Sequence, residues 1–283
     1  WRPDGELARL NAKAGAGAVE ISSDLQAALA TMQQLASDTA GAFDPAVGSL
    51  VVRYATPSPA DDKAQKPLPI SEVLSLESGR ASLASGAALD AGGIGKGIAL
   101  DAIAVELRRG GAKGAFLDFG GSSQLAFGRS DAGEPWRVAV AGIEAGQILG
   151  TIALDGAMAT SRSRPAGDAS GPIVDPRNGS LVAEPRLATC VATSAAVADA
   201  WSTALVVLGS GALARAETYG VTAVVQAAGG PPVSSPEFAR ALVSLERRGL
   251  RVRGPRRSRR PERRPRDPPR QQRLRIGGRT TTP

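Results

Sequence analysis

The chain has 283 residues, of which 42% are hydrophobic and 4% aromatic, so its core must be built mainly from small aliphatic side chains. It contains no histidine and one cysteine, Cys190, which excludes an internal disulfide, a histidine general base and a zinc site of histidines or cysteines. The formal net charge of +7 arises in residues 247–283, which hold 15 arginines and two acids. No apolar run is long enough to predict a transmembrane segment.

The predicted elements alternate without a regular βα repeat. Apolar residues at helical spacing predict an amphipathic helix over Asp24–Ser37, with Ser22 and Ser23 as N-cap candidates, and residues 55–71 predict a solvent-facing loop. Strand-like runs follow at Val73–Leu76, Ala115–Phe119, Arg137–Val140, Ile148–Leu154, Leu187–Thr193 and Val221–Gln226, and helices at about 98–109, 195–208 and 211–219. This mixture predicts an α+β fold with a mixed or antiparallel sheet and packed helices.

Four glycines surround Lys96 in the segment Leu89–Gly97, just before a helix predicted at about Ile98 to Arg108. Glycine lets the backbone approach a ligand, and the first N–H groups of the helix would point to the same place as the lysine ammonium, which suits a phosphate or pyrophosphate. The segment is not a Walker A loop, because Gly97 stands where Ser or Thr would be needed. Taken alone, a turn without a ligand explains it equally well.

A polar notch interrupts the predicted helix 195–208, whose circumference is otherwise mostly apolar. It consists of Asp199, Ser202 and Thr203. Asp199 and Thr203 are four residues apart and therefore stack on one face of the helix. A solvated face would be broader and more charged, although a structural notch remains the alternative. A carboxylate and a hydroxyl are hard oxygen donors that Mg²⁺ accepts beside substrate phosphates and water.

Together, four segments in this order resemble the FAD:protein FMN transferases, once described as thiamine-biosynthesis lipoproteins. The four segments are Ala42–Gly48, Leu89–Gly97, Ile173–Gly179 and Ala198–Leu205. The resemblance runs from Trp1 to about Phe238. It implies a single flavin-transferase-like α+β domain, which begins abruptly at Trp1 and is therefore expected to be truncated at its N-terminus.

The resemblance also implies roles for individual residues. Mg²⁺ would be held by Asp199, Thr203 and the backbone carbonyl of Gly93. FAD, the substrate, would contact Ala42, Phe43, Asp44, Asp90, Lys96 and Val174. Trp1 stands at the place of an aromatic residue that stacks on the flavin in the family, an assignment that suits a large flat ring. A frayed terminal tryptophan is the alternative.

Some positions depart from the family pattern. Pro172 stands where the family usually has a histidine, three residues before its Asp-Pro pair. Asp118 and Ser122 stand on either side of a Gly-Gly pair where the family has Asn and Asp, and Arg162 replaces a usual glycine. These changes bear on turnover more than on fold, and no catalytic residue is assigned. Two hypotheses follow: Asp175 takes the proton instead, or Arg162 and Ser122 block the acceptor.

From about Gly249 the composition changes to arginine and proline, with too little apolar surface for a core. We therefore expect a transferase-like domain over residues 1–248 and a disordered tail over residues 249–283. The tail is either a polycation that associates with anionic polymers or membranes, or a GC-rich stretch read in the wrong frame. The compartment stays open: cytoplasmic, or periplasmic or membrane-anchored if a signal is missing from the sequence.

The sequence thus predicts an enzyme that uses Mg²⁺ to transfer FMN from FAD to a Thr or Ser hydroxyl of a partner protein, with release of AMP. The alternatives are a catalytically degenerate FAD-binding protein and a slow FAD pyrophosphatase. Specific nucleic-acid binding is not expected, because the positive charge is confined to a tail without aromatic readers.

Overall fold

The structure, a computed structural model, describes residues 4–55, 66–163 and 173–243. Trp1, Pro172 and the predicted tail over residues 249–283 lie outside these ranges. The boundary predicted after residue 248 therefore stays a prediction. Among the described residues, no helix is both long and apolar enough to cross a membrane.

The N-terminal part of the described chain is mostly helical. Its helices are α1 (Glu6–Ala12), α2 (Ser23–Asp38), the 3₁₀ turn η1 (Pro45–Val47), α3 (Gly48–Ala55) and α4 (Ile70–Val73). A small antiparallel sheet accompanies them, in the order β1 (Val19–Glu20), β3 (Arg80–Leu83) and β2 (Leu74–Glu77). Ser22 is the N-cap of α2, since its hydroxyl accepts a hydrogen bond from the Leu25 N–H at 3.2 Å.

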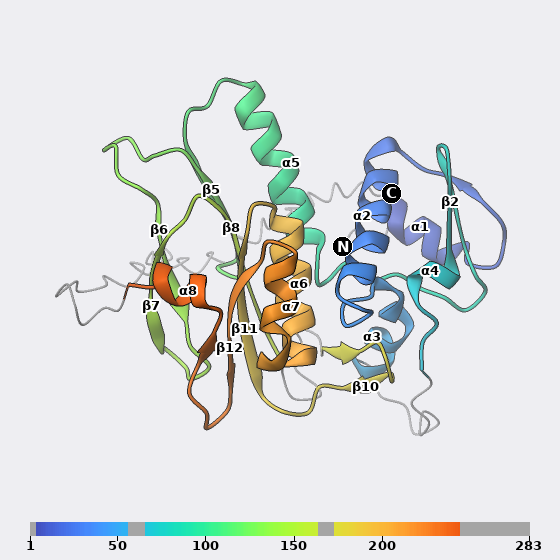
Figure 1. Cartoon of the computed structure of the whole chain (residues 1–283). Helices are drawn as coiled ribbons and strands as arrows, with labels where there is room; N and C mark the ends of the chain where they lie inside the picture. Colours follow the sequence, from blue (N-terminus) through green and yellow to red (C-terminus); the bar gives the residue numbers. More distant parts are fainter. Residues whose placement is uncertain (1–3, 56–65, 164–172, 244–283) are drawn as a thin grey trace, which may run out of the picture. The chain divides into compact units, whose positions relative to one another are not determined.

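A six-stranded antiparallel sheet forms the centre of the C-terminal part. Its order is β13 (Val233–Ser234), β12 (Thr222–Ala227), β11 (Arg186–Ala192), β8 (Gly156–Arg162), β5 (Ser123–Phe127) and β4 (Ala115–Phe119). On one face lie helices α5 (Gly95–Arg109), α6 (Ala195–Leu208) and α7 (Leu213–Thr218), with the short turn η2 (Ser210–Ala212). On the other lie the hairpin of β6 (Arg137–Ala141) and β7 (Ile148–Ala153) and helix α8 (Pro236–Ala241) (Figure 1).

The two faces of β8 belong to different cores. Ala157 and Ala159 join the large cluster that also contains the buried side chains of α2, α5 and α6, whereas Met158 between them joins the smaller cluster under the hairpin. This alternation follows from strand geometry, in which successive side chains point to opposite faces. A separate short hairpin of β9 (Val174–Asp175) and β10 (Ser180–Leu181) is tied to α3 by the Tyr54 hydroxyl, which donates to the Gly179 carbonyl at 2.8 Å.

The α+β class and the antiparallel sheets are confirmed. The helices expected over 24–37 and 195–208 correspond to α2 and α6, and the six expected strands appear within one residue of their predicted starts. Two expectations were wrong locally: the helix predicted from about Ile98 begins at Gly95, and the end of the predicted loop 55–71 forms the turn α4. Strands β5 and β8 were not predicted, because their short, mostly apolar or small residues show no alternation.

Candidate functional site

Helices α5 and α6 meet at their N-terminal ends. A Cβ on Gly97 would overlap the carbonyl oxygen of Ala195, so only glycine allows this close approach. One turn later, the Asp101 carboxylate accepts hydrogen bonds from the Ser194 hydroxyl at 2.7 Å and from the N–H groups of Ala195 and Ala196 at 2.8 and 3.0 Å. Asp101 of α5 thus caps the N-terminal end of α6 and fixes the position of that end against α5.

Asp199 of α6 lies at this junction and is only 2% exposed. The Gly97 N–H donates to its Oδ2 at 3.1 Å, the Ser123 hydroxyl donates to its Oδ1 at 3.2 Å, and the Lys96 ammonium lies 3.6 Å from Oδ2. Burial raises the pKa of Asp199, while Lys96 and the two donors oppose that rise. The predicted anion-binding elements, Lys96 and the first turn of α5, therefore face a carboxylate of the chain itself.

Thr203 lies one turn beyond Asp199, among further hydroxyls. The Ser161 Oγ is 2.7 Å from the Ser202 Oγ and 3.2 Å from the Thr203 Oγ1. A Cβ on Gly93 would be 3.0 Å from the Thr203 Oγ1 and 3.3 Å from the Phe43 ring. The structure therefore brings together Gly93, Asp199, Thr203, Lys96 and Phe43, which the sequence places as much as 160 residues apart.

These residues fit a divalent cation by the chemistry of their donors. The Asp199 carboxylate, the Thr203 hydroxyl and the Gly93 carbonyl are all oxygen ligands, which Mg²⁺ prefers. Within the described ranges, no group of three or more histidine, cysteine or acidic side chains is assembled. A site with one carboxylate leaves positions for substrate phosphates and water, as is usual for Mg²⁺ in enzymes that act on phosphates.

Asp44, another predicted FAD contact, is 5% exposed and bonded only to the backbone in the described structure. Its Oδ1 accepts from the Ala46 N–H at 2.9 Å, and its Oδ2 accepts from the Ile70 N–H at 3.0 Å. Burial raises the pKa of Asp44, and the two backbone donors oppose that rise. The carboxylate caps η1 and anchors the start of α4, so it shapes the turn that carries Phe43. Ala42 and Val174 are also buried.

The segment before the glycine turn is held by Asn11 of α1. Its side-chain amide donates to the Leu89 carbonyl at 2.8 Å and accepts from the Leu89 N–H at 2.9 Å. Next to it, Asp90 is half-buried and accepts only the Gly92 N–H, at 3.2 Å, among the hydrogen bonds that the structure describes for its carboxylate. Burial raises the pKa of Asp90. Sequence reasoning assigned no role to Asn11, Asp101 or Ser161, and no local motif marks Asp101 or Ser161.

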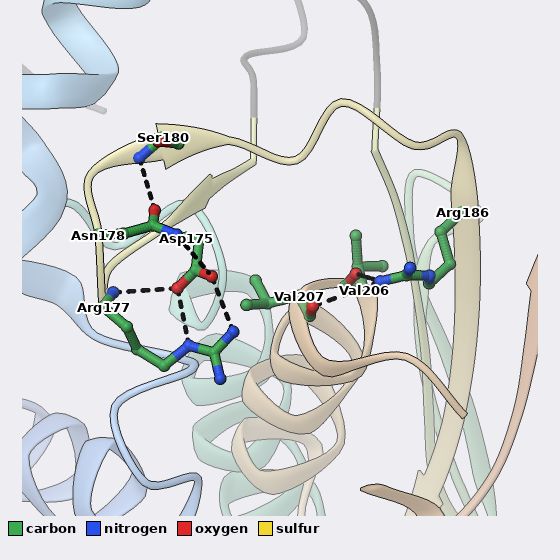
Figure 2. A network of polar contacts seen from close by, with 7 residues as sticks. All are labelled: Asp175, Arg177, Asn178, Ser180, Arg186, Val206 and Val207. Carbon is green, nitrogen blue, oxygen red and sulfur yellow. Dashed lines mark hydrogen bonds and ion pairs between the residues drawn. The ribbon is translucent and has the colours of Figure 1, made fainter. Parts of the chain in front are cut away.

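The turn after β9 is closed by an ion pair (Figure 2). Arg177 donates from Nε to Oδ1 of Asp175 at 2.9 Å and from Nη2 to Oδ2 at 2.7 Å, and Asn178 accepts from the Ser180 N–H at 2.8 Å. Burial raises the pKa of Asp175, but Arg177 outweighs it and holds that pKa below its ordinary value. A carboxylate paired in this way is poorly suited to take a proton, which weakens the hypothesis that Asp175 replaces the missing histidine.

Two arginines serve structural contacts. Arg162 donates to the carbonyls of Gly142, at 2.9 Å, and Ile143, and so reaches the turn of the β6–β7 hairpin. The Arg162 side chain therefore lies on the face of β8 that packs against the β6–β7 hairpin, and Ser161 points to the opposite face. This placement argues against the hypothesis that Arg162 blocks the acceptor. Arg186 donates to the Val206 carbonyl at 2.6 Å and holds the C-terminal end of α6 (Figure 2).

Two cavities lie beside the Asp44 turn. The smaller, of about 170 Å³, is lined in part by Asp44, Lys66 and Arg177, and the larger, of about 410 Å³, by residues of η1, α3 and the loop after β3. Neither is lined by Asp199 or Thr203. The cavities therefore lie at the helical N-terminal part, on the side where the resemblance places the flavin contacts Ala42–Asp44.

Comparison with known proteins gives a consistent result. Residues 1–225 match the model of the ApbE family. The chain is 31% identical over 268 residues to the FAD:protein FMN transferase of Rhodobacter capsulatus, a match that covers 87% of this chain and 50% of that protein. The chain thus spans half the length of this curated relative.

Solved structures show the same fold. The apo flavinyl transferase ApbE of Pseudomonas stutzeri is 26% identical, with a TM-score of 0.73 over 85% of this chain and 82% of that one. The flavin transferase ApbE of Vibrio cholerae is 24% identical, with a TM-score of 0.75 over 86% of this chain and 84% of that one.

Proposed function

Because this chain belongs to the ApbE family, we propose that it transfers FMN from FAD to a Thr or Ser hydroxyl of a target protein, with Mg²⁺ as cofactor. The hydroxyl oxygen forms a bond to the FMN phosphorus, the pyrophosphate bond breaks, and AMP leaves. The observation that supports this best is the convergence of Gly93, Asp199 and Thr203 beside Lys96. It joins an oxygen-only cation site to a cationic side chain at a helix N-terminus.

We assign the cation to Asp199, Thr203 and the Gly93 carbonyl. When bound, Mg²⁺ withdraws charge from the pyrophosphate. Lys96 is 38% exposed along its side chain, so its ammonium has room to turn from Asp199 to a phosphate oxygen of the substrate. Phosphoryl transfer depends mainly on such positioning and electrostatics, which this chain retains.

We assign the flavin contacts to Ala42, Phe43, Asp90 and Val174. Trp1 is added to them on the sequence alone. The half-buried Asp90 carboxylate keeps acceptor capacity for a ligand, because one backbone N–H is its described donor. Asp44 contributes differently, since backbone donors occupy its oxygens and it holds Phe43 in place. Phe43 is 4% exposed and lies next to Gly93, so it joins the flavin side of the site to the cation side.

The proton of the acceptor hydroxyl has no assigned base. The chain lacks histidine and Asp175 is paired with Arg177, so we expect transfer to be slower by part of the ~10²–10⁴-fold that a general base contributes. The same observation favours a second candidate function, a slow FAD pyrophosphatase in which water replaces the acceptor hydroxyl and the products are FMN and AMP.

The test is to incubate the full chain with FAD, Mg²⁺ and a candidate acceptor domain. In-gel flavin fluorescence detects FMN bound to the acceptor, and chromatography detects AMP. We expect a fluorescent acceptor band and AMP, both lost with EDTA. An acceptor in which every Thr and Ser is replaced by Ala or Val is the matched control.

The other outcomes separate the alternatives. AMP and free FMN without a fluorescent band would identify the pyrophosphatase. FAD binding without AMP across a panel of acceptors would identify a binding protein and contradict the proposed transfer. A fluorescent band that persists in EDTA would contradict the role of Mg²⁺.

A further inference from the structure

The hydroxyls beside Thr203 form a chain that ends at the backbone of α6. Ser202 is fully buried, and its Oγ lies 2.8 Å from the Asp199 carbonyl oxygen and 2.7 Å from the Ser161 Oγ. Ser161 Oγ in turn lies 3.2 Å from the Thr203 Oγ1. Ser161 comes from β8, and Asp199, Ser202 and Thr203 come from α6, so these hydrogen bonds connect the sheet to the helix.

The hydrogen bonds among these hydroxyls can have only one set of donor and acceptor directions. A carbonyl oxygen only accepts, so Ser202 donates its one hydroxyl proton to Asp199. Ser202 must then accept from Ser161 at 2.7 Å, which uses the one proton of Ser161. Ser161 can therefore only accept at its remaining contact, and Thr203 donates to it.

This order determines what Thr203 presents to a ligand. The Thr203 proton points to Ser161, and both lone pairs of its Oγ1 are left for other partners. A neutral hydroxyl binds a cation through a lone pair, and a proton aimed at the cation would oppose binding. Gly93 adjoins the same atom, since a Cβ there would be 3.0 Å from Oγ1.

We propose that Ser161 is a positioning residue that draws the Thr203 hydroxyl proton away from the cation site, so that Oγ1 offers lone pairs to a divalent cation. The inference rests on the proposed function, because it takes the cation site at Asp199 and Thr203 as its premise. Ser161 acts through Thr203 and does not itself contact the cation. A residue that orients a metal ligand through a hydrogen bond typically contributes ~10- to 100-fold in metal affinity.

The strand supplies a matched control. Thr160 precedes Ser161 in β8 and points to the opposite face, where its hydroxyl lies 2.9 Å from that of Thr189. Replacing Thr160 by Val deletes a hydrogen-bonded hydroxyl from the same strand without touching Thr203. Ser161→Ala and Thr160→Val therefore differ in the face from which the hydroxyl is removed.

The experiment titrates Mn²⁺ alone into the full chain and measures free Mn²⁺ by electron paramagnetic resonance, with melting temperatures recorded in parallel. We expect Ser161→Ala to weaken Mn²⁺ binding by ~10- to 100-fold, and Ser161→Thr, which keeps the hydroxyl, to restore most of the affinity. Thr160→Val should bind Mn²⁺ as the parent does. If Ser161→Ala does not fold, Ser202→Ala replaces it, because the freed Ser161 proton then competes for Oγ1 and weakens binding.

Asp199→Asn distinguishes a failure of the cation site from a failure of the positioning role of Ser161. If Asp199→Asn loses Mn²⁺ binding while Ser161→Ala keeps the parent affinity, the positioning role is overturned and the cation site stands. If the parent leaves Mn²⁺ free, or Asp199→Asn binds it as the parent does, the cation site and the positioning role both fail. Equal weakening by Thr160→Val and Ser161→Ala would also overturn the role of Ser161.

Discussion

Two buried carboxylates, in different parts of the molecule, have different kinds of partners. Asp44, in the helical N-terminal part, is 5% exposed, and Asp199, at the junction of α5 and α6, is 2% exposed. Burial raises the pKa of both. Asp44 accepts from the backbone N–H groups of Ala46 and Ile70, whereas Asp199 faces one backbone N–H, one hydroxyl and the Lys96 ammonium.

The kind of partner, more than burial or pKa, therefore separates a structural carboxylate from one that binds a ligand. Backbone donors cannot leave without local unfolding, so the oxygens of Asp44 are permanently committed. A lysine whose side chain is 38% exposed can swing away and be exchanged for another cation. Asp199 therefore keeps the capacity to bind a ligand, whereas Asp44 supports the turn that carries Phe43.

The largest effect is expected where the geometry at Asp199 depends on close helix packing. In Gly97→Ala, the added methyl would overlap the Ala195 carbonyl, so we expect the free energy of unfolding to fall by about 3 kcal/mol, the upper end of the range for overpacking. Gly95→Ala is the control, because its methyl would lie 3.6 Å from the Ala91 Cβ, an ordinary contact. Urea unfolding measures both, and equal stability of the two variants would contradict the close approach at Gly97.

The structural role of Asp44 predicts the next largest effect. Asp44→Ala removes the cap of η1 and leaves the Ile70 N–H without its acceptor, so we expect a loss of about 2 kcal/mol in the free energy of unfolding. Mn²⁺ affinity should stay at the parent value. If Asp44→Ala kept its stability but lost Mn²⁺ binding, Asp44 would be a binding residue and its structural role would be contradicted.

Lys96 is the partner that distinguishes Asp199 from Asp44, so its removal should change ligand binding at Asp199. In Lys96→Met, no ammonium competes with Mn²⁺ for Asp199. In the absence of FAD we therefore expect Mn²⁺ to bind ~2- to 5-fold more tightly, a factor that corresponds to the strength of a partly exposed ion pair. FAD affinity, measured by calorimetry, should fall. Lys113→Met, an exposed lysine beyond α5, should change neither quantity.

The smallest effect is a pH dependence at Asp44. Because burial raises its pKa in the folded chain above the ordinary value of 3.8, the folded state binds more protons than the unfolded state between these two values. The stability contributed by Asp44 therefore falls as pH rises through this window. Asp44→Asn keeps an Oδ1 acceptor without this titration, so its stability relative to the parent should rise over the same pH range in urea unfolding. A constant difference would contradict the burial effect.

The elements that sequence predicted best are those with a periodic pattern. Residues 24–37 were predicted as a helix because apolar residues recur at helical spacing, and the structure shows α2 over Ser23–Asp38, with one face buried. Strand β5 was missed because all five of its residues are buried, which removes the alternation that marks a half-exposed strand. Periodicity reports a boundary between core and solvent, so it fails where both faces are covered.

The candidate site was predictable only in part, for a related reason. The spacing of Asp199 and Thr203 places them on one helix face, and their polar character in an apolar helix marks them. The partners come from distant segments, since Gly97 and Ser123 precede Asp199 by 102 and 76 residues. Neither the turn of Lys96 toward Asp199 nor the contact of Ser161 with Thr203 follows from any local pattern.

Asp44 and Asp199 can be compared in the same reaction. Asp199→Asn and Asp44→Asn are assayed for Mg²⁺-dependent release of AMP from FAD, with stability measured for each. We expect Asp199→Asn to remain folded and to lower the rate by about 100-fold or more, beyond the effect of a single orienting partner. Asp44→Asn should keep the rate within a few-fold of the parent. An active Asp199→Asn, or an Asp44→Asn that is folded but inactive, would contradict the distinction between the two sites.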